Sequence, residues 1–207
     1  MQRQTASTLA RLLMHRDADA IALTGGAAID FHLTALGDQP SRHSSTDLDF
    51  VVSRIDAVGE SVSRDFLVSH YHVPRSGVPK FLLQLVDPIA RLRIDIFPDL
   101  AGSVASAEWH EVGATRVKVL TLASIFEHKL QTLSRASVDR PVDPKHLRDA
   151  ERLGRRLGRD VPPVAREALQ PDIYGGDTDA SCQKCEASRH PGFPLAPKEQ
   201  VFTLLGW

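Results

Sequence analysis

The sequence predicts an α+β fold, because six strand-like segments lie before or end at Leu120 and a helical period begins at Thr121. Asp87 and Pro88 indicate a hairpin turn between two of the strands. Thr121 is expected to cap one helix, and Asp143 followed by Pro144 marks the start of another. We expect strands at 21–23, 48–52, 66–72, 80–86, 91–97 and 117–120, an N-terminal helix, a helix at 27–36 and a helix-prone segment at 57–64.

The main domain is expected to cover residues 1–160 and to include the C-terminal helical part. Beyond Gly158 the composition becomes rich in Pro, Gly, Asp and Ser. Residues 161–207 are therefore predicted to form an irregular tail, in which segments 161–169 and 201–207 carry the apolar residues needed for packing.

Composition excludes several classes of protein. The 25 Lys and Arg residues nearly balance the 26 Asp and Glu residues, so the net charge of −1 supplies no global field for holding nucleic acid. No stretch approaches the roughly 20 apolar residues of a membrane helix, and the N-terminus lacks the apolar core of a secretory signal. We therefore expect a cytoplasmic protein that depends on its apolar core, since its two cysteines are too close together to join distant segments.

Two aspartates on one predicted strand are the strongest functional signal. Asp47 and Asp49 are two residues apart, so their side chains emerge on the same face of the strand. Adjacent carboxylates repel each other unless a cation lies between them, and Mg²⁺ prefers oxygen ligands. An ordinary exposed strand face is the alternative interpretation.

A third aspartate lies on another predicted strand. Asp95 stands between Ile94 and Ile96, so it points away from the face that these isoleucines bury. With Asp47 and Asp49 it would complete a site for two cations, which stabilise the attacking and leaving oxygens of a phosphoryl-type displacement. Asp99 is the rival third carboxylate, although it lies beyond Pro98, where the strand is expected to have ended.

Gly25 and Gly26 lie between a predicted strand and a predicted helix. Backbone N–H groups and the helix dipole favour an anion at such a position, whereas the alternative is a tight turn without a ligand. The aspartates of the next strand favour the first interpretation, because phosphate and its cations would meet in one place.

These motifs together resemble those of the DNA polymerase β-like nucleotidyltransferase superfamily, in particular its AbiEii-type toxin branch. The resemblance rests on Leu23-Thr24-Gly25-Gly26-Ala27-Ala28, on Ser45-Thr46-Asp47-Leu48-Asp49-Phe50 and on Ile94-Asp95-Ile96. It implies a mixed β-sheet flanked by helices, two Mg²⁺ ions bound by Asp47, Asp49 and Asp95, and a nucleoside triphosphate near Gly25, Gly26 and Ser45. The branch also implies an antitoxin protein as a partner.

Lys129 falls on the apolar stripe of its predicted helix, where an unpaired buried ammonium would be costly. A nearby anion would offset that cost, or the side chain could extend its charged end to water. The resemblance implies that Lys129 contacts the triphosphate and that Asp149 orients a basic partner or assists the acceptor. The chain departs from the family at Ala27, at His146 and in the register of Arg42 and His43.

Two further features leave alternatives open. A row of arginines on the last predicted helix is either a solvated face or a surface for the phosphates of an RNA acceptor. Cys182, Cys185 and His190 have half the spacing of a structural zinc site, which His110, Asp177 or a second subunit would complete; free thiols are the alternative. The arginines are Arg148, Arg152, Arg155, Arg156 and Arg159.

The sequence thus favours an enzyme that transfers NMP from an NTP to an acceptor hydroxyl and releases pyrophosphate. RNA, protein side chains and small molecules are all open as acceptors. The alternative is a non-catalytic nucleotide-binding module that keeps the fold without turnover.

Overall fold

The computed structural model describes residues 3–38, 47–72, 82–134, 143–163 and 195–205. The chain divides into two compact units, Met1–Leu120 with Cys182–Trp207, and Thr121–Ser181. Sequence analysis assigned the helices after Thr121 to a main domain of residues 1–160. In the structure, the helices at Leu122–Ser134 and Lys145–Leu157 pack on each other within the second unit, and the predicted domain of residues 1–160 stays a prediction.

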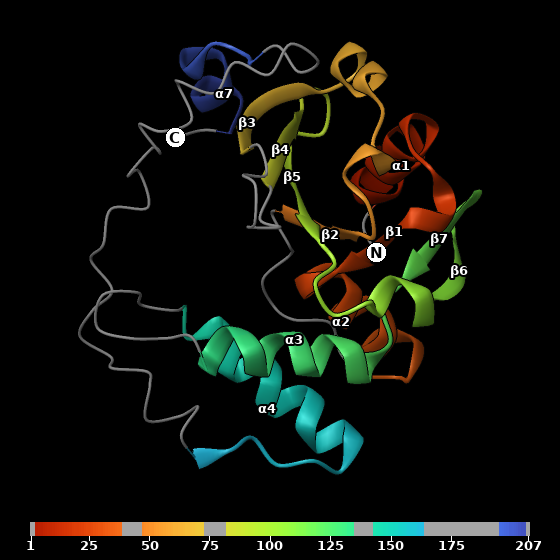
Figure 1. Ribbon diagram of the computed structural model, residues 1–207, viewed down its shortest axis with the longest axis vertical. Helices are drawn as coiled ribbons and strands as arrows, with labels where there is room; N and C mark the ends of the chain where they lie inside the picture. The colour runs from red at the N-terminus through yellow and green to blue at the C-terminus, as the bar shows by residue number, and fades with distance from the viewer. Residues whose placement is uncertain (1–2, 39–46, 73–81, 135–142, 164–194, 206–207) are drawn as a thin grey trace. The chain divides into compact units, whose positions relative to one another are not determined.

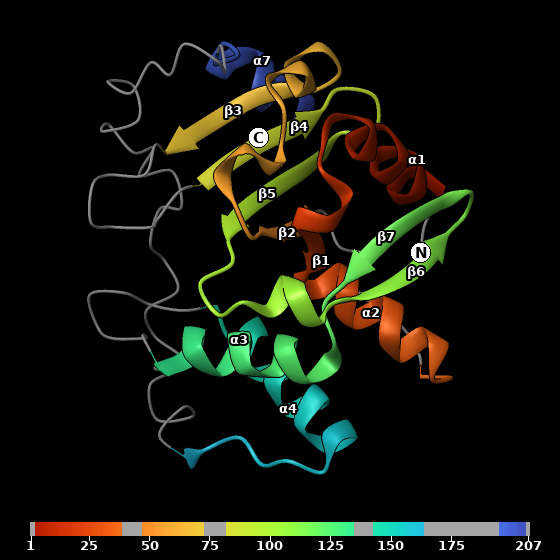
Figure 2. The ribbon, with the colours of Figure 1, turned by 45° about the vertical axis from the view of Figure 1, so that its right-hand side comes forward.

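The described part of the first unit contains a seven-stranded mixed sheet (Figures 1 and 2). The strand order is β3-β4-β5-β2-β1-β7-β6; β2 pairs parallel with β5 and β1 parallel with β7, while the other pairs are antiparallel. The strands are β1 (Ile21–Thr24), β2 (Asp47–Val52), β3 (Leu67–His72), β4 (Leu82–Asp87), β5 (Leu92–Pro98), β6 (Glu108–Val112) and β7 (Thr115–Val119).

Among the described residues of this unit, three α-helices flank the sheet. The helix α1 (Arg3–Leu12) contacts β7, α2 (Gly25–Ala35) contacts β1 and β2, and α7 (Lys198–Leu205) contacts β3. The predicted α+β class, with a mixed sheet flanked by helices, is therefore confirmed.

Alternation of apolar and acidic residues explains the central strands. Leu48 and Phe50 of β2 are completely buried, whereas Asp47 and Asp49 on the same strand are half-buried. Ile94 and Ile96 of β5 are also completely buried. The apolar residues thus fix which face of each strand packs into the core and leave the aspartates on the other face.

Two elements differ from expectation. The edge strand β6 was not predicted, because its sequence EWHEV is mostly polar and lacks an apolar run. The helix-prone segment 57–64 forms two short 3₁₀ helices, Ile55–Ala57 and Glu60–Arg64. Gly59 separates them and breaks the longer helix.

Asp87 ties α1 to the hairpin between β4 and β5. Its side chain is completely buried, accepts a 2.5 Å hydrogen bond from Thr8 Oγ1 and forms an ion pair with Arg11. The backbone N–H groups of Ile89 and Ala90 donate to its other oxygen at 2.8 and 3.0 Å. Burial alone would raise the pKa of Asp87, but hydrogen bonds from Arg11, Thr8 and the turn lower it below its usual value.

The second unit contains α3 (Leu122–Ser134) and α4 (Lys145–Leu157), which pack against each other (Figure 1). The predicted caps are present: Thr121 Oγ1 accepts from the Ser124 N–H at 3.2 Å, and Asp143 Oδ1 accepts from the Lys145 N–H at 2.7 Å. The buried side chains of the two helices include Ile125, Phe126, Leu133, Ala150 and Leu153.

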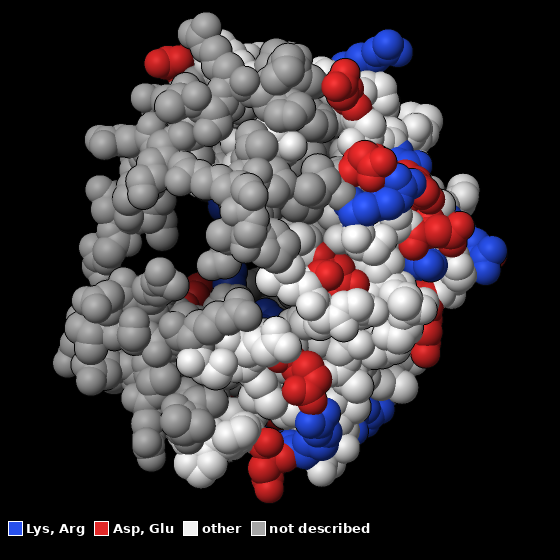
Figure 3. All heavy atoms as spheres, in the orientation of Figure 1, with Lys and Arg blue, Asp and Glu red and all other residues white. Residues whose placement is uncertain are grey.

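Acidic and basic side chains are interspersed on the face shown in Figure 3, in keeping with the near-zero net charge. Within the segments that the structure describes, no helix combines the length and apolar character required to cross a membrane.

We predict that Asp87→Asn lowers the free energy of unfolding by about 3 kcal/mol, because it leaves the guanidinium group of Arg11 without its carboxylate. Urea unfolding measures this loss. Asp56→Asn is the matched control, since its carboxylate is 76% exposed and should leave stability unchanged. Equal stability of the two variants would contradict the structural role of Asp87.

Candidate functional site

Three aspartates lie on one face of the central sheet. The parallel pairing of β2 with β5 places Asp49 directly opposite Asp95, and Asp47 lies two residues before Asp49 on the same face. Asp95 is only 6% exposed, whereas Asp47 and Asp49 are half-buried. The register therefore places the three aspartates that sequence analysis singled out on one face of the sheet, and their role as metal ligands stays a prediction.

Arg93 lies among these carboxylates, and sequence analysis did not single it out. Its Nη2 donates a 3.1 Å hydrogen bond to Asp47 Oδ2, and its Nε lies 3.3 Å from Asp95 Oδ2. Alternation along β5 was a signal that could have found it, because Arg93 and Asp95 are two residues apart and share a face.

Asp99, the alternative candidate for the third carboxylate, has a structural role. It accepts hydrogen bonds of 2.7 Å from both Ser103 Oγ and the Val104 backbone N–H. Burial alone would raise the pKa of Asp99, but these hydrogen bonds lower it below its usual value. Asp99 therefore holds the loop after β5 in place.

The backbone of Gly25 lies against the Asp49 side chain. A Cβ atom on Gly25 would stand 2.0 Å from Asp49 Oδ2, and the φ angle of +67° is itself unfavourable for other residues. The helix α2 begins at Gly25, two residues earlier than expected, so both Gly25 and Gly26 belong to its first turn. The positive end of the α2 dipole thus lies beside Asp49.

The donor set has the chemistry of a site for a hard divalent cation, since three carboxylates on adjacent strands offer oxygen ligands only. In the described conformation, however, no group of three or more His, Cys, Asp or Glu side chains among the described residues is close enough to hold a metal ion. Arg93 instead links Asp47 to Asp95. The residue types therefore fit Mg²⁺, while their present arrangement is held by a guanidinium group.

In the second unit, Lys129 is buried and paired. It is 7% exposed, and its Nζ donates a 2.7 Å hydrogen bond to Asp149 Oδ2. The anion needed to offset its burial is therefore Asp149, and the alternative of a charged end in water does not hold. The role of both residues in nucleotide binding stays a prediction.

His146, which is half-buried, also contacts Lys129. Its Nδ1 lies 3.3 Å from Lys129 Nζ and is positioned to accept a hydrogen bond from the ammonium group. Burial, followed by the charges of Lys129 and Lys145, lowers the pKa of His146 to about 4. The imidazole is therefore neutral at pH 7, which keeps a second positive charge away from Lys129.

Some predicted site residues lie outside the described residues: Ser45, Cys182, Cys185 and His190. His110, one suggested fourth zinc ligand, is described and lies on β6. Its ring contacts those of Phe31 and His32, with centroid distances of 4.9 and 5.5 Å. The zinc site stays a prediction.

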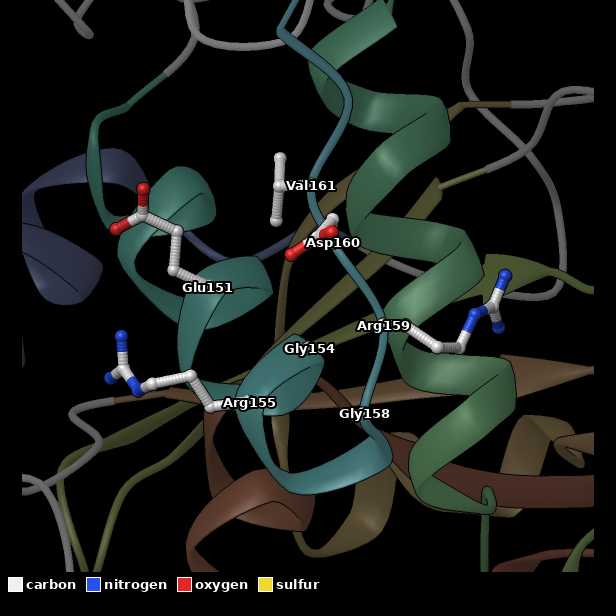
Figure 4. Close-up of a pocket in the computed structure, with 7 residues that line it drawn as sticks. All are labelled: Glu151, Gly154, Arg155, Gly158, Arg159, Asp160 and Val161. Atoms are coloured by element: carbon white, nitrogen blue, oxygen red, sulfur yellow. The ribbon is translucent and has the colours of Figure 1, made fainter.

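Two arginines of the row predicted for the last helix, Arg155 and Arg159, have different orientations. Arg159 lies beyond the end of the helix, pairs with Glu127 at 2.6 Å and covers the ring of Phe126. A cavity of about 560 Å³ adjoins the end of α4, and Figure 4 shows Arg155 and Arg159 pointing in opposite directions there. The cavity is lined by Glu151, Gly154, Arg155, Gly158, Arg159, Asp160 and Val161.

We predict that Gly25→Ala destabilises the first unit and displaces Asp49, because the added methyl group overlaps the carboxylate. Gly37→Ala is the matched control: Gly37 also has a positive φ angle, of +83°, but a Cβ atom added there would have no neighbour within 4 Å. Urea unfolding should show a loss for Gly25→Ala that exceeds that of Gly37→Ala by ~2 kcal/mol or more. Equal losses would mean that the close approach to Asp49 is unimportant.

We predict that His146 makes stability depend on pH between about 4 and 6.5. Its folded pKa is lower than its unfolded pKa, so the unfolded chain binds the extra proton and stability falls as the pH falls through this window. His146→Gln should remove this dependence, on the order of 1–3 kcal/mol, when unfolding free energies are compared at pH 7 and pH 4.5. An identical pH dependence in both proteins would contradict the assignment.

No protein-family model matches the chain, and no curated protein sequence matches it either. Among solved structures, JHP933 from Helicobacter pylori is similar at 13% identity, with 84% of this chain and 72% of that chain covered and a TM-score of 0.42. The antibiotic-resistance factor ANT(2'')-Ia is similar at 18% identity, with coverage of 81% and 90% and a TM-score of 0.43. The Megavirus polyadenylate synthase is similar at 10% identity, with coverage of 80% and 34% and a TM-score of 0.43.

Proposed function

We propose that the chain is a metal-dependent nucleotidyltransferase, which transfers NMP from an NTP to an acceptor hydroxyl. One observation carries the proposal: the N-terminal turn of α2 lies against Asp49, which stands opposite Asp95. A helix N-terminus favours phosphate, and carboxylates favour divalent cations. Their combination at one point suits a metal-bound triphosphate.

The residues have distinct roles in this proposal. Asp47 and Asp49 would hold Mg²⁺ together with the triphosphate, and Gly25 and Gly26 would present backbone N–H groups to phosphate oxygens. Mg²⁺ would offset the negative charge that develops on the phosphate oxygens. Gly25 is needed because a side chain there would occupy the space of the Asp49 carboxylate.

Asp95 would act on the acceptor. It accepts the proton of the acceptor hydroxyl while that oxygen forms a bond to the α-phosphorus of the NTP. The bond from the α-phosphorus to the bridging oxygen breaks, and pyrophosphate leaves with the electron pair. The products are the nucleotidylated acceptor and pyrophosphate. Acceptors of three classes are open: RNA, protein side chains and small molecules.

A second candidate is a nucleotide-binding module without turnover. The contacts of Arg93 favour it, because a guanidinium group that stays with Asp47 and Asp95 would keep both carboxylates from a metal. Ala27 also favours it, since a hydroxyl that could bind phosphate is missing directly after the two glycines.

We predict that Asp49→Asn lowers label transfer from α-labelled NTPs by at least about 100-fold, because the amide neither carries the charge nor replaces the oxygen ligand. Each NTP is incubated with Mg²⁺ and with RNA, protein and hydroxyl-bearing small molecules as acceptors. Asp56→Asn, at an exposed carboxylate, is the control and should retain transfer. Tight NTP binding without transfer by the unmodified protein would support the module instead.

Three finer predictions accompany the proposal. These are membership of the AbiEii-type branch, an antitoxin protein as partner, and contact of Lys129 with the triphosphate. Lys129 Nζ donates a 2.7 Å hydrogen bond to Asp149 Oδ2, which positions the ammonium group. Contact of Lys129 with the triphosphate therefore predicts that Lys129→Met and Asp149→Asn each weaken NTP binding.

A further inference from the structure

Arg93 stands where the proposed metal site needs a cation. Four side chains form a square on one face of the sheet, because Arg93 pairs in register with Asp47 and Asp95 pairs with Asp49. Three corners of this square are acidic, and the fourth, Arg93, is basic. Its guanidinium group contacts Asp47 Oδ2 and Asp95 Oδ2, which are two oxygens of the proposed metal-binding set.

The charges in this square are partly removed from water. The exposed fractions of the side chains are 30% for Arg93, 21% for Asp47 and 9% for Asp95. Three carboxylates in such surroundings repel one another more strongly than at an exposed surface. A positive charge is therefore required for the metal-free protein to keep this arrangement.

The hold of Arg93 on the carboxylates is incomplete. Its Nη2 makes a hydrogen bond to Asp47, but its Nε has no hydrogen-bond partner among the described residues, although it lies 3.3 Å from Asp95. A full two-pronged guanidinium–carboxylate contact would be much stronger. The group thus neutralises the site and can still be displaced.

We propose that Arg93 is an internal competitor of the divalent cation: its guanidinium group occupies Asp47 and Asp95 until a metal ion displaces it. This inference rests on the proposed function, because it assumes that the aspartates bind metal. It explains why the three aspartates have the chemistry of a metal site although no metal-binding cluster occurs among the described residues in this conformation. It also implies that the chain binds metal weakly in the absence of nucleotide.

The test is the binding of Mn²⁺ alone to the full chain. Electron paramagnetic resonance measures the concentration of the free ion during the titration. Arg93→Gln should bind Mn²⁺ about tenfold more tightly than the unmodified protein, because the competitor is gone and the carboxylates keep their full charge. Arg91→Gln is the matched control, since it removes the same charge from an exposed residue two positions away and should leave the affinity nearly unchanged.

Thermal stability supplies a second readout that needs no activity. Metal-free Arg93→Gln should melt at a lower temperature than the unmodified protein, and Mn²⁺ should raise its melting temperature by a larger amount. Arg93→Lys keeps the positive charge but presents a single ammonium group to the carboxylates. It should bind Mn²⁺ with intermediate affinity, and it serves as the test protein if Arg93→Gln does not fold.

The outcomes separate the two proposals. If the unmodified protein binds Mn²⁺ and Arg93→Gln binds it equally or less tightly, Arg93 is not a competitor, while the proposed metal site stands. If none of the unmodified protein, Arg93→Gln and Arg93→Lys binds Mn²⁺ at millimolar concentration, the metal site and the competition are both overturned. Tighter binding by Arg93→Gln alone, with Arg91→Gln unchanged, supports the inference.

Discussion

The parallel pairing of β2 with β5 is the constraint on which the candidate site depends. It places Asp49 opposite Asp95 and Asp47 opposite Arg93, although the paired residues are 46 positions apart in the sequence. A slip of one residue would send the aspartates of one strand to the apolar face. The completely buried Leu48 and Ile94 oppose such a slip, because it would expose them. The apolar core therefore sets the geometry of the polar site.

Charge balance on this face follows from that register. Three carboxylates share one face of the sheet near the end of β1, where α2 begins, and two features offset their repulsion. One is the positive end of the α2 dipole beside Asp49, which the absence of a Gly25 side chain permits. The other is the guanidinium group of Arg93. These two positive groups therefore offset the repulsion between the carboxylates in the metal-free chain.

The second unit also offsets the charge of a buried side chain, and it does so with fewer groups. Lys129 is buried on α3, and α4 supplies both Asp149 and His146 to it. Because the imidazole stays neutral at pH 7, the group contains one positive and one negative charge. Phe126 packs nearby against α4, where Gly154 leaves room for its ring and for the chain that returns after Gly158. Packing and charge pairing therefore join the same two helices.

The sequence by itself determined the elements and the faces of their residues. Alternation along β2 and β5 placed Asp47, Asp49 and Asp95 on polar faces, and the two glycines marked the start of α2 to within two residues. Only the tertiary structure decided which faces meet: Arg93 with Asp47, Lys129 with Asp149, and Asp99 with its own loop. The polar edge strand β6 could be identified only from its pairing with β7. The physical reason is that periodicity along the chain reports local geometry, whereas strand register and helix packing depend on contacts between residues far apart in sequence.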